Sequence, residues 1–123
     1  MSDIPGLTLT TVNIGAPDPG PLARFYQRLL GWAISAEEPD RVRDPAGGVG
    51  LSFQAEASYT APVWPAGPED PAMMMHLEIR VDDLAAAGEH ATACGAAPAE
   101  FQSQDDVRVF LDPAGHPFCL RLA

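Results

Sequence analysis

The sequence predicts an α+β fold built from two related modules, each with the element order strand, helix and three further strands. The main observation is an internal repeat. In each half a strand-like segment is followed by an aspartate that can cap a helix. Asp18 follows Thr11 by seven residues, and Asp83 follows the matching residue His76 by the same spacing. Each helical pattern then ends at a glycine, and each half carries the turn sequence Asp-Pro-Ala-Gly. Two such modules can surround one cleft that neither can close alone.

The first module is predicted at about residues 7–56. Leu7–Ile14 is rich in Thr, Val, Leu and Ile, which is typical of a strand. Asp18 followed by Pro19 indicates a helix start, since Asp is a good N-cap and proline suits the first helical position. Apolar residues at helical spacing continue to Gly31, which favours a helix end. The remaining strands of this module are expected at Trp32–Ser35, Arg41–Arg43 and Gly50–Glu56.

A proline-rich connector is predicted between the modules, at residues 57–74. It contains Pro62, Pro65, Pro68 and Pro71, which together exclude a regular helix or a central strand. Trp64 lies in this segment, and an indole in a loop usually packs against another part of the protein.

The second module is predicted at about residues 75–122. Met75–Val81 has the clearest apolar and polar alternation of the chain, which indicates a strand. A helix is expected from Asp83 to Cys94, with a stripe of small residues that would let it lie close to a sheet. The other strands are expected at Ala99–Phe101, Val107–Leu111 and Phe118–Leu122.

Composition limits both domain number and function. The 123 residues suffice for one domain, 1–123, and the chain has 7 Lys+Arg against 17 Asp+Glu, a net charge of −10. All basic residues are arginines. This charge argues against nucleic acid or an anionic membrane as a partner, and the absence of lysine excludes a P-loop. The two cysteines cannot form a disulfide framework, no apolar run approaches a membrane span, and Met1–Gly6 shows no secretory signal, so we expect a cytoplasmic protein.

Three spaced motifs carry a resemblance to a known superfamily. They are Asp18-Pro19 to Trp32, His76 to Leu84, and Asp112-Pro113-Ala114-Gly115-His116-Pro117-Phe118. Together they make the chain, from about Leu7 to Leu122, similar to the vicinal oxygen chelate superfamily, which includes glyoxalase I, bleomycin-resistance proteins and extradiol dioxygenases. The chain resembles most closely its small stand-alone glyoxalase-like members. The resemblance implies that the paired βαβββ modules form an eight-stranded, open, mixed sheet around a ligand cleft, and one fold of this kind hosts many activities.

The resemblance also identifies positions for a metal site. Metal-dependent members hold a divalent ion with four ligands, one from the first and one from the last strand of each module, usually His, Gln or Glu. The corresponding residues here are Thr11, Gln54, His76 and Cys119, with Ser52 as the alternative to Gln54. Thr11 is a neutral hydroxyl and Cys119 is a soft ligand in a site that otherwise uses oxygen and nitrogen. The sequence therefore predicts no metal site of the usual kind and no cofactor, although a divalent metal stays possible.

His76 and Glu78 allow two interpretations. They lie two residues apart on one face of the same predicted strand, so Glu78 can simply satisfy a structural histidine, or the two can act as base and orienting group. Cys119 is read either as a buried apolar side chain or as a group that lines the cleft.

Strand alternation predicts which residues line the cleft. Leu51, Phe53, Phe118 and Leu120 should face the two helices, on the convex side, while His76 and Cys119 face away from them. The expected lining is Thr11, Asn13, Gln54, His76, Glu78 and Cys119, with Trp64 over one end.

Two functions are compatible with this lining. The first is the metal-free binding of a small, weakly polar organic molecule between aromatic side chains. The alternative is an enzyme of the lyase, isomerase or dioxygenase type, with an altered metal site or with His76 and Glu78 as an acid–base pair. Because each module leaves a large sheet face to cover, and because related proteins are commonly dimeric, we also expect a homodimer.

Overall fold

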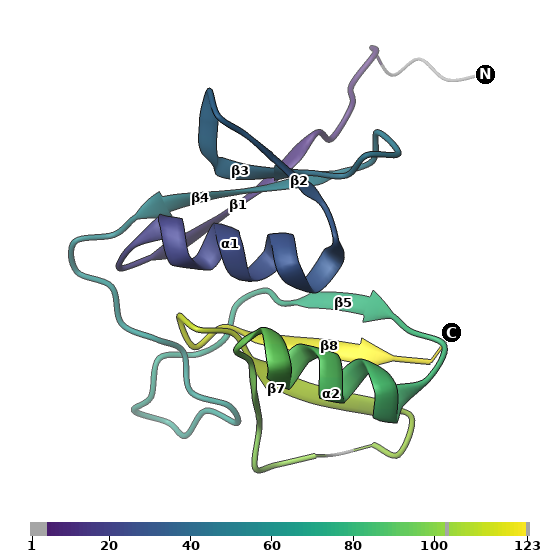
Figure 1. The fold of residues 1–123 in the computed structure, drawn as a ribbon. Helices are drawn as coiled ribbons and strands as arrows, with labels where there is room; N and C mark the ends of the chain where they lie inside the picture. Colours follow the sequence, from purple (N-terminus) through teal and green to yellow (C-terminus); the bar gives the residue numbers. More distant parts are fainter. Residues whose placement is uncertain (1–4, 103, 123) are drawn as a thin grey trace.

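The computed structural model describes residues 5–102 and 104–122. The predicted domain of residues 1–123 and the segment Met1–Gly6 therefore extend in part beyond the described residues. These residues form two helices and eight strands, and Figure 1 shows how they are arranged. The elements are β1 (Thr11–Ala16), α1 (Pro19–Leu30), β2 (Ala33–Ser35), β3 (Glu38–Arg43), β4 (Gly50–Ala55), β5 (Leu77–Arg80), α2 (Leu84–Cys94), β6 (Ala97–Pro98), β7 (Val107–Leu111) and β8 (Pro117–Arg121).

The strands form two four-stranded mixed sheets with matching topology. Their orders are β1-β4-β3-β2 and β5-β8-β7-β6. In each sheet the first and last strands of a module pair in parallel, and the other neighbours are antiparallel. This confirms the α+β class and the βαβββ repeat. Within the described residues, the edge strands β1 and β5 are not paired with each other, so the eight strands form two sheets that remain open toward one another.

Both helices begin and end where their capping residues predict. The Asp18 side chain accepts a hydrogen bond from Gly20 N at 3.1 Å, and α1 ends at Gly31 with a φ of 69°. Asp83 caps α2 in the same way, accepting from Ala86 N at 3.1 Å. In both modules the aspartate bonds a backbone N–H group that would otherwise be unpaired at the helix start. An aspartate at this position therefore predicts the start of each helix correctly.

The small-residue stripe of α2 brings this helix close to its sheet. Ala91 is fully buried, and a Cβ atom added at Gly88 would lie 3.3 Å from Cζ of Phe110. That distance leaves little room for a side chain, so glycine at this position permits the close approach of α2 to β7.

The apolar faces of the two sheets contribute to one shared core. Helix α1 supplies Leu22, Phe25 and Tyr26, all at most 1% exposed. The Tyr26 ring stacks on Phe53 of the first sheet at 5.7 Å, and the Phe25 ring meets Phe118 of the second at 5.9 Å. Figure 1 shows α1 between the first sheet and β5 of the second, and α1 also contacts α2. The polar faces therefore point away from this core.

The register predicted for both sheets is confirmed. Leu51 and Phe53 are each 4% exposed, while Phe118 and Leu120 are at most 2% exposed, and all four belong to the core that contains the helices. Cys119 alternates with its two apolar neighbours, and its partner in the parallel register is Glu78, so both side chains lie on the opposite face.

A buried hydrogen bond joins the modules. Tyr26 Oη of α1 donates to Asp112 Oδ2 at 2.7 Å, and Asp112 is 4% exposed. The other carboxylate oxygen accepts from the backbone N–H groups of Ala114 and His116, at 2.9 and 3.0 Å, which fixes the β7–β8 turn. Burial raises the pKa of Asp112, although its hydrogen bonds oppose that rise. Burial also raises the pKa of Tyr26 well above its usual value.

Two strands begin later than the sequence indicates. The predicted strand Leu7–Ile14 is displaced, because β1 begins at Thr11, where its pairing with β4 begins opposite Gly50. The preceding Leu7 and Leu9 are 80% and 70% exposed. Similarly, β5 begins at Leu77, after the exposed Met75. Apolar and β-branched residues favour a strand only where a partner strand runs beside them.

The strand expected at Ala99–Phe101 lies instead at Ala97–Pro98, as β6. A side chain explains why pairing stops early. The amide of Gln102 donates to Val109 O at 2.9 Å and accepts from Val109 N at 2.9 Å, as a peptide group of a neighbouring strand would. Beyond β6 the backbone makes one further bond to β7, from Ala99 N to Val109 O at 2.9 Å, and the Gln102 side chain then takes the place of a backbone partner for Val109.

None of the helices in the described residues has the length and apolar character needed to cross a membrane.

The Tyr26 to Asp112 bond predicts a large stability difference between two tyrosine variants. Tyr26→Phe leaves a buried carboxylate oxygen unpaired and should lower the free energy of unfolding by about 1.5–3 kcal/mol. Tyr59→Phe is the matched control. It removes a bond of 2.6 Å from Tyr59 Oη to a backbone carbonyl, that of Ala114, and should cost about 0.5–1.5 kcal/mol. Urea denaturation of both variants measures the difference, and equal costs would contradict the prediction.

The same comparison has a predicted pH dependence. The Tyr26 hydroxyl stabilises the charged form of Asp112, so the phenylalanine variant raises the pKa of that carboxyl further. The cost of Tyr26→Phe should therefore be greatest above the pKa of Asp112 and shrink as pH falls through it.

Candidate functional site

The first sheet presents a row of polar side chains on its outer face. The parallel register of β1 and β4 pairs Asn13 with Ser52 and Gly15 with Gln54, so Thr11, Asn13, Ser52 and Gln54 all lie on the same face. Asn13 Nδ2 donates to Ser52 Oγ at 2.7 Å. Both positions considered for the last-strand ligand, Gln54 and Ser52, are thus on the face that the alternation requires.

Two of these side chains are engaged by neighbours of their own module. The guanidinium of Arg41 donates to Thr11 Oγ1. The amide of Gln54 donates to the Glu56 carboxylate. Both groups are therefore held by their own sheet.

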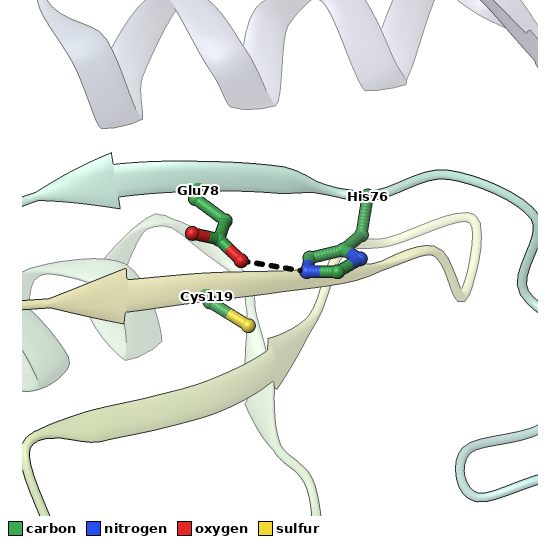
Figure 2. A group of neighbouring side chains, drawn as sticks. All are labelled: His76, Glu78 and Cys119. Atoms are coloured by element: carbon green, nitrogen blue, oxygen red, sulfur yellow. Dashed lines mark hydrogen bonds and ion pairs between the residues drawn. The ribbon is translucent and has the colours of Figure 1, made fainter.

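The second sheet brings three chemically active side chains together. His76 immediately precedes β5, Glu78 lies within it, and Cys119 lies beside Glu78 on β8. Their ligand atoms all lie within 4.8 Å of one another. Figure 2 shows the three side chains together, with the hydrogen bond between His76 and Glu78 dashed. His76 Nε2 donates to Glu78 Oε2 at 3.1 Å. We call these three residues the His–Glu–Cys cluster.

Charge and burial act differently on two members of this cluster. Glu78 Oε1 accepts a hydrogen bond from Arg121 at 2.8 Å, and this contact, together with the one from His76, lowers the pKa of the Glu78 carboxyl. The pKa of the Cys119 thiol is raised, first by burial and then by the negative charge of Glu78. Cys119 is 7% exposed, and its burial favours the neutral thiol over the thiolate.

Trp64 covers part of the second sheet. It packs against a small apolar group formed by Ala99, Val109 and Cys119. Its indole nitrogen is buried and has no hydrogen-bond partner among the described residues. The connector thus reaches the polar face of the second sheet beside the His–Glu–Cys cluster.

A cavity of about 590 Å³ lies where the connector meets both modules. Its wall is mainly apolar, and β1, the start of β5, the connector and the β7–β8 turn contribute to it. The lining residues are Val12, Asn13, Ile14, Gly15, Tyr26, Tyr59, Thr60, Pro62, Pro71, Ala72, Met73, Met74, Met75, His76, Leu77, His116 and Pro117. Of the residues expected in the pocket, Asn13 and His76 line this cavity, whereas Thr11, Gln54, Trp64, Glu78 and Cys119 lie outside it.

Sequence reasoning missed several residues of this wall. Tyr59 Oη donates to Ala114 O at 2.6 Å, and His116 Nε2 donates to Gly15 O at 2.7 Å. Burial raises the pKa of Tyr59. The run Met73–Met75 was an available signal, because flexible thioether side chains often line apolar binding surfaces, but in sequence it reads equally well as core packing.

The comparisons with known proteins identify the family. Residues 11–121 match the family model described as a glyoxalase-like domain. The chain belongs to the glyoxalase-like domain family. The vicinal oxygen chelate superfamily indicated by the three motifs is thereby confirmed. No protein of curated function matches the chain by sequence.

Several solved structures share the glyoxalase-like fold at low sequence identity. A glyoxalase/bleomycin resistance protein/dioxygenase family enzyme from Burkholderia phytofirmans PsJN is 20% identical, with a TM-score of 0.70 over 94% of this chain and 98% of its own. TnmS3, an antibiotic binding protein from Streptomyces sp. CB03234, is 18% identical, with a TM-score of 0.63 over 99% and 98%. The oxidase ChaP-H2 is 20% identical, with a TM-score of 0.66 over 95% and 94%. These similarities concern the fold.

The residues of this glyoxalase-like chain do not fit a four-ligand metal centre shared by the two modules. Thr11 is a neutral hydroxyl bonded to Arg41, and Gln54 is bonded to Glu56. The potential ligands that the structure does bring together all come from the second module. The first module therefore offers no carboxylate or imidazole at the two expected positions.

Proposed function

We propose that this glyoxalase-like protein binds a small, weakly polar organic molecule in the cavity between the connector and the two modules, without the four-ligand metal centre of metal-dependent relatives. The observation that carries the proposal is the cavity itself. Its volume of about 590 Å³ lies within the range of about 300–1,000 Å³ usual for ligand sites. Only a few polar groups interrupt its apolar wall.

Those polar groups suit hydrogen bonding better than charge pairing. Asn13, Tyr59, His76 and His116 offer amide, hydroxyl and imidazole groups, and neither Arg nor Lys lines the cavity. The net charge of −10 gives no attraction for anions. A neutral molecule with one or two polar substituents therefore matches the wall better than a phosphate or a polyanion.

The known proteins of this fold are consistent with such a ligand. TnmS3 is described as an antibiotic binding protein, so the fold can serve as a binding module for an organic molecule. The similarity of 18% transfers no residue of that site to this chain, and the proposed binding depends on this protein's own cavity.

A substitution that fills the cavity tests the proposal. Ala72 lines the wall, and Ala72→Trp should weaken binding of the neutral dye Nile red at least about tenfold, because the indole occupies the space for the ligand. Fluorescence titration gives the dissociation constants. Ala46→Trp, in the exposed β3–β4 turn, is the matched control and should bind like the unmodified protein.

The same titration tests two further features. Binding should be unchanged by EDTA, because no metal takes part. The anionic dye 1-anilinonaphthalene-8-sulfonate should bind more weakly than Nile red. Equal Nile red affinities for the Ala72→Trp and unmodified proteins would overturn the proposal.

One observation favours an enzyme as the second candidate. His76 lines the cavity, its ring is hydrogen-bonded to Glu78, and Arg121 holds Glu78 in turn. This arrangement can orient an imidazole as a general base toward a bound molecule, as an isomerase or lyase of the glyoxalase type would need.

Exchange of the carbon-bound protons of an enolisable ketone for deuterium shows whether His76 acts as a base or only lines the cavity. Proton NMR in D₂O with dihydroxyacetone as the probe should show exchange by the unmodified protein, if His76 acts as a base. Glu78→Gln, outside the cavity, should slow this exchange at least about tenfold while Nile red binding stays intact. No exchange above buffer would reject the enzyme and leave the binding function standing.

We also propose that the protein is a homodimer. Leu7, Leu9, Met74 and Met75 are 80%, 70%, 92% and 76% exposed. They lie directly before the two edge strands β1 and β5, each of which has one edge unpaired within the part of the chain that the structure describes. Exposed apolar residues beside open sheet edges are a suitable surface for a second copy.

The dimer predicts a mass of twice 13.0 kDa in sedimentation equilibrium at micromolar concentration. Leu7→Glu combined with Leu9→Glu should shift the protein to monomer, since two charges would then face the partner. Phe101→Glu is a matched control at a 48% exposed site away from these strands, and it should remain dimeric. A monomeric unmodified protein would contradict the assignment.

A further inference from the structure

Five of the six polar side chains in the cavity wall donate a hydrogen bond to another group of the protein. Tyr59 Oη donates to Ala114 O at 2.6 Å, and Tyr26 Oη donates to a buried carboxylate at 2.7 Å. Asn13 Nδ2 donates to a serine hydroxyl at 2.7 Å. In each of these three side chains the oxygen atom keeps lone pairs that can accept a further hydrogen bond.

The two imidazoles of the wall are each held in one tautomer. His116 Nε2 lies 2.7 Å from Gly15 O, and His76 Nε2 lies 3.1 Å from the Glu78 carboxylate (Figure 2). A carbonyl or an ionised carboxylate can only accept, so Nε2 carries the hydrogen in both rings. In the neutral ring Nδ1 then holds a lone pair, and no hydrogen bond among the described residues reaches either Nδ1. Each neutral imidazole is therefore left with an acceptor and no free donor.

The backbone of the wall adds to this imbalance between acceptors and donors. Pro62, Pro71 and Pro117 line the cavity, and proline has a carbonyl oxygen but no N–H group. Two side-chain donors remain, the second N–H of Asn13 and the hydroxyl of Thr60. Among the side chains of the wall, unused acceptors therefore outnumber unused donors.

We propose that the cavity selects neutral molecules that carry two or more O–H or N–H donors, such as diols, phenols or amides, an inference that rests on the proposed function and names its class of ligand. A ligand of this class can hydrogen-bond to lone pairs that it would otherwise bury without a partner. An ether or a ketone of similar shape cannot. The difference matters because a buried polar group without a partner loses more free energy than a hydrogen bond gains.

Two carboxylates strengthen the acceptors of the wall. Asp112 accepts the hydrogen bond of Tyr26, and Glu78 accepts that of His76. A donor group that is bonded to a carboxylate becomes a better acceptor for a second hydrogen bond, because hydrogen bonds in a chain polarise one another. Arg121 balances the charge of Glu78 but does not line the cavity. The charges around the wall therefore also favour a ligand that donates.

Two probes of similar shape test this preference. The diol 2,7-dihydroxynaphthalene has two O–H donors, and in the diether 2,7-dimethoxynaphthalene methyl groups replace both hydrogens. A cavity that only excluded water would bind the diether about tenfold tighter, because its two methyl groups add apolar surface. The wall described here should instead bind the diol at least about threefold tighter than the diether. Displacement of Nile red from the untagged full-length chain gives both dissociation constants, at about pH 8 to stay above the usual titration range of histidine.

Variants of the wall show whether its acceptors cause the preference. Tyr59→Phe and Asn13→Val each remove an acceptor that lines the cavity, and together they should reverse the preference, so that the diether binds more tightly. The ratio of the two dissociation constants is the readout, because a general change in the cavity affects both probes alike. Thr11→Val is the matched control. It removes a hydroxyl of β1 outside the cavity and should keep the ratio of the unmodified protein.

The outcomes separate this inference from the proposed function. A diether that binds the unmodified protein as tightly as the diol, or more tightly, would overturn the inference. An unchanged ratio in the Tyr59 and Asn13 double variant, or a ratio altered by Thr11→Val, would overturn it as well. In each of these cases Nile red binding that Ala72→Trp weakens would leave the proposed function standing. If neither Nile red nor the two naphthalenes bind, the proposed function and this inference are both rejected.

Discussion

The buried hydrogen bond from Tyr26 to Asp112 holds the two modules together inside their shared core. It links α1 of the first module to the β7–β8 turn of the second at 2.7 Å, inside the core. The same carboxylate holds the turn through backbone N–H groups, and this turn places His116 against the carbonyl oxygen of Gly15. One side of the cavity, which Tyr26 itself lines, therefore depends on this buried bond.

A shared core has consequences for both sheets. Because α1 contributes Phe25 and Tyr26 to the apolar faces of both, the polar faces are turned outward and the edge strands β1 and β5 are left open. The cavity then forms between these strands, and the connector completes its wall. The cavity and the His–Glu–Cys cluster share one residue, His76. Trp64 of the connector packs against Cys119 of the cluster.

Much of this arrangement could be predicted because the relevant signals are local. Asp18 and Asp83 define helix starts by side-chain caps, and strand alternation brings Glu78 beside Cys119. The cavity could not be predicted, since prolines such as Pro62 and Pro71 indicate only that regular structure is absent and leave the path of the connector undetermined. The first strand was displaced because Leu7 has the composition of a strand but no partner.

The amide of Gln102 has a consequence for aggregation. Sheet edges with free backbone groups recruit other chains, and proteins commonly block them with charge, proline or a covering segment. Here β6 is short, and beyond it the Gln102 side chain bonds both the N–H and the carbonyl of Val109, a carbonyl that also accepts from Ala99 N. Pro98 removes a further donor from the same edge. The β6 edge of the second sheet is thereby protected against pairing with a strand of another chain, because side-chain hydrogen bonds and a proline occupy or remove its free backbone groups.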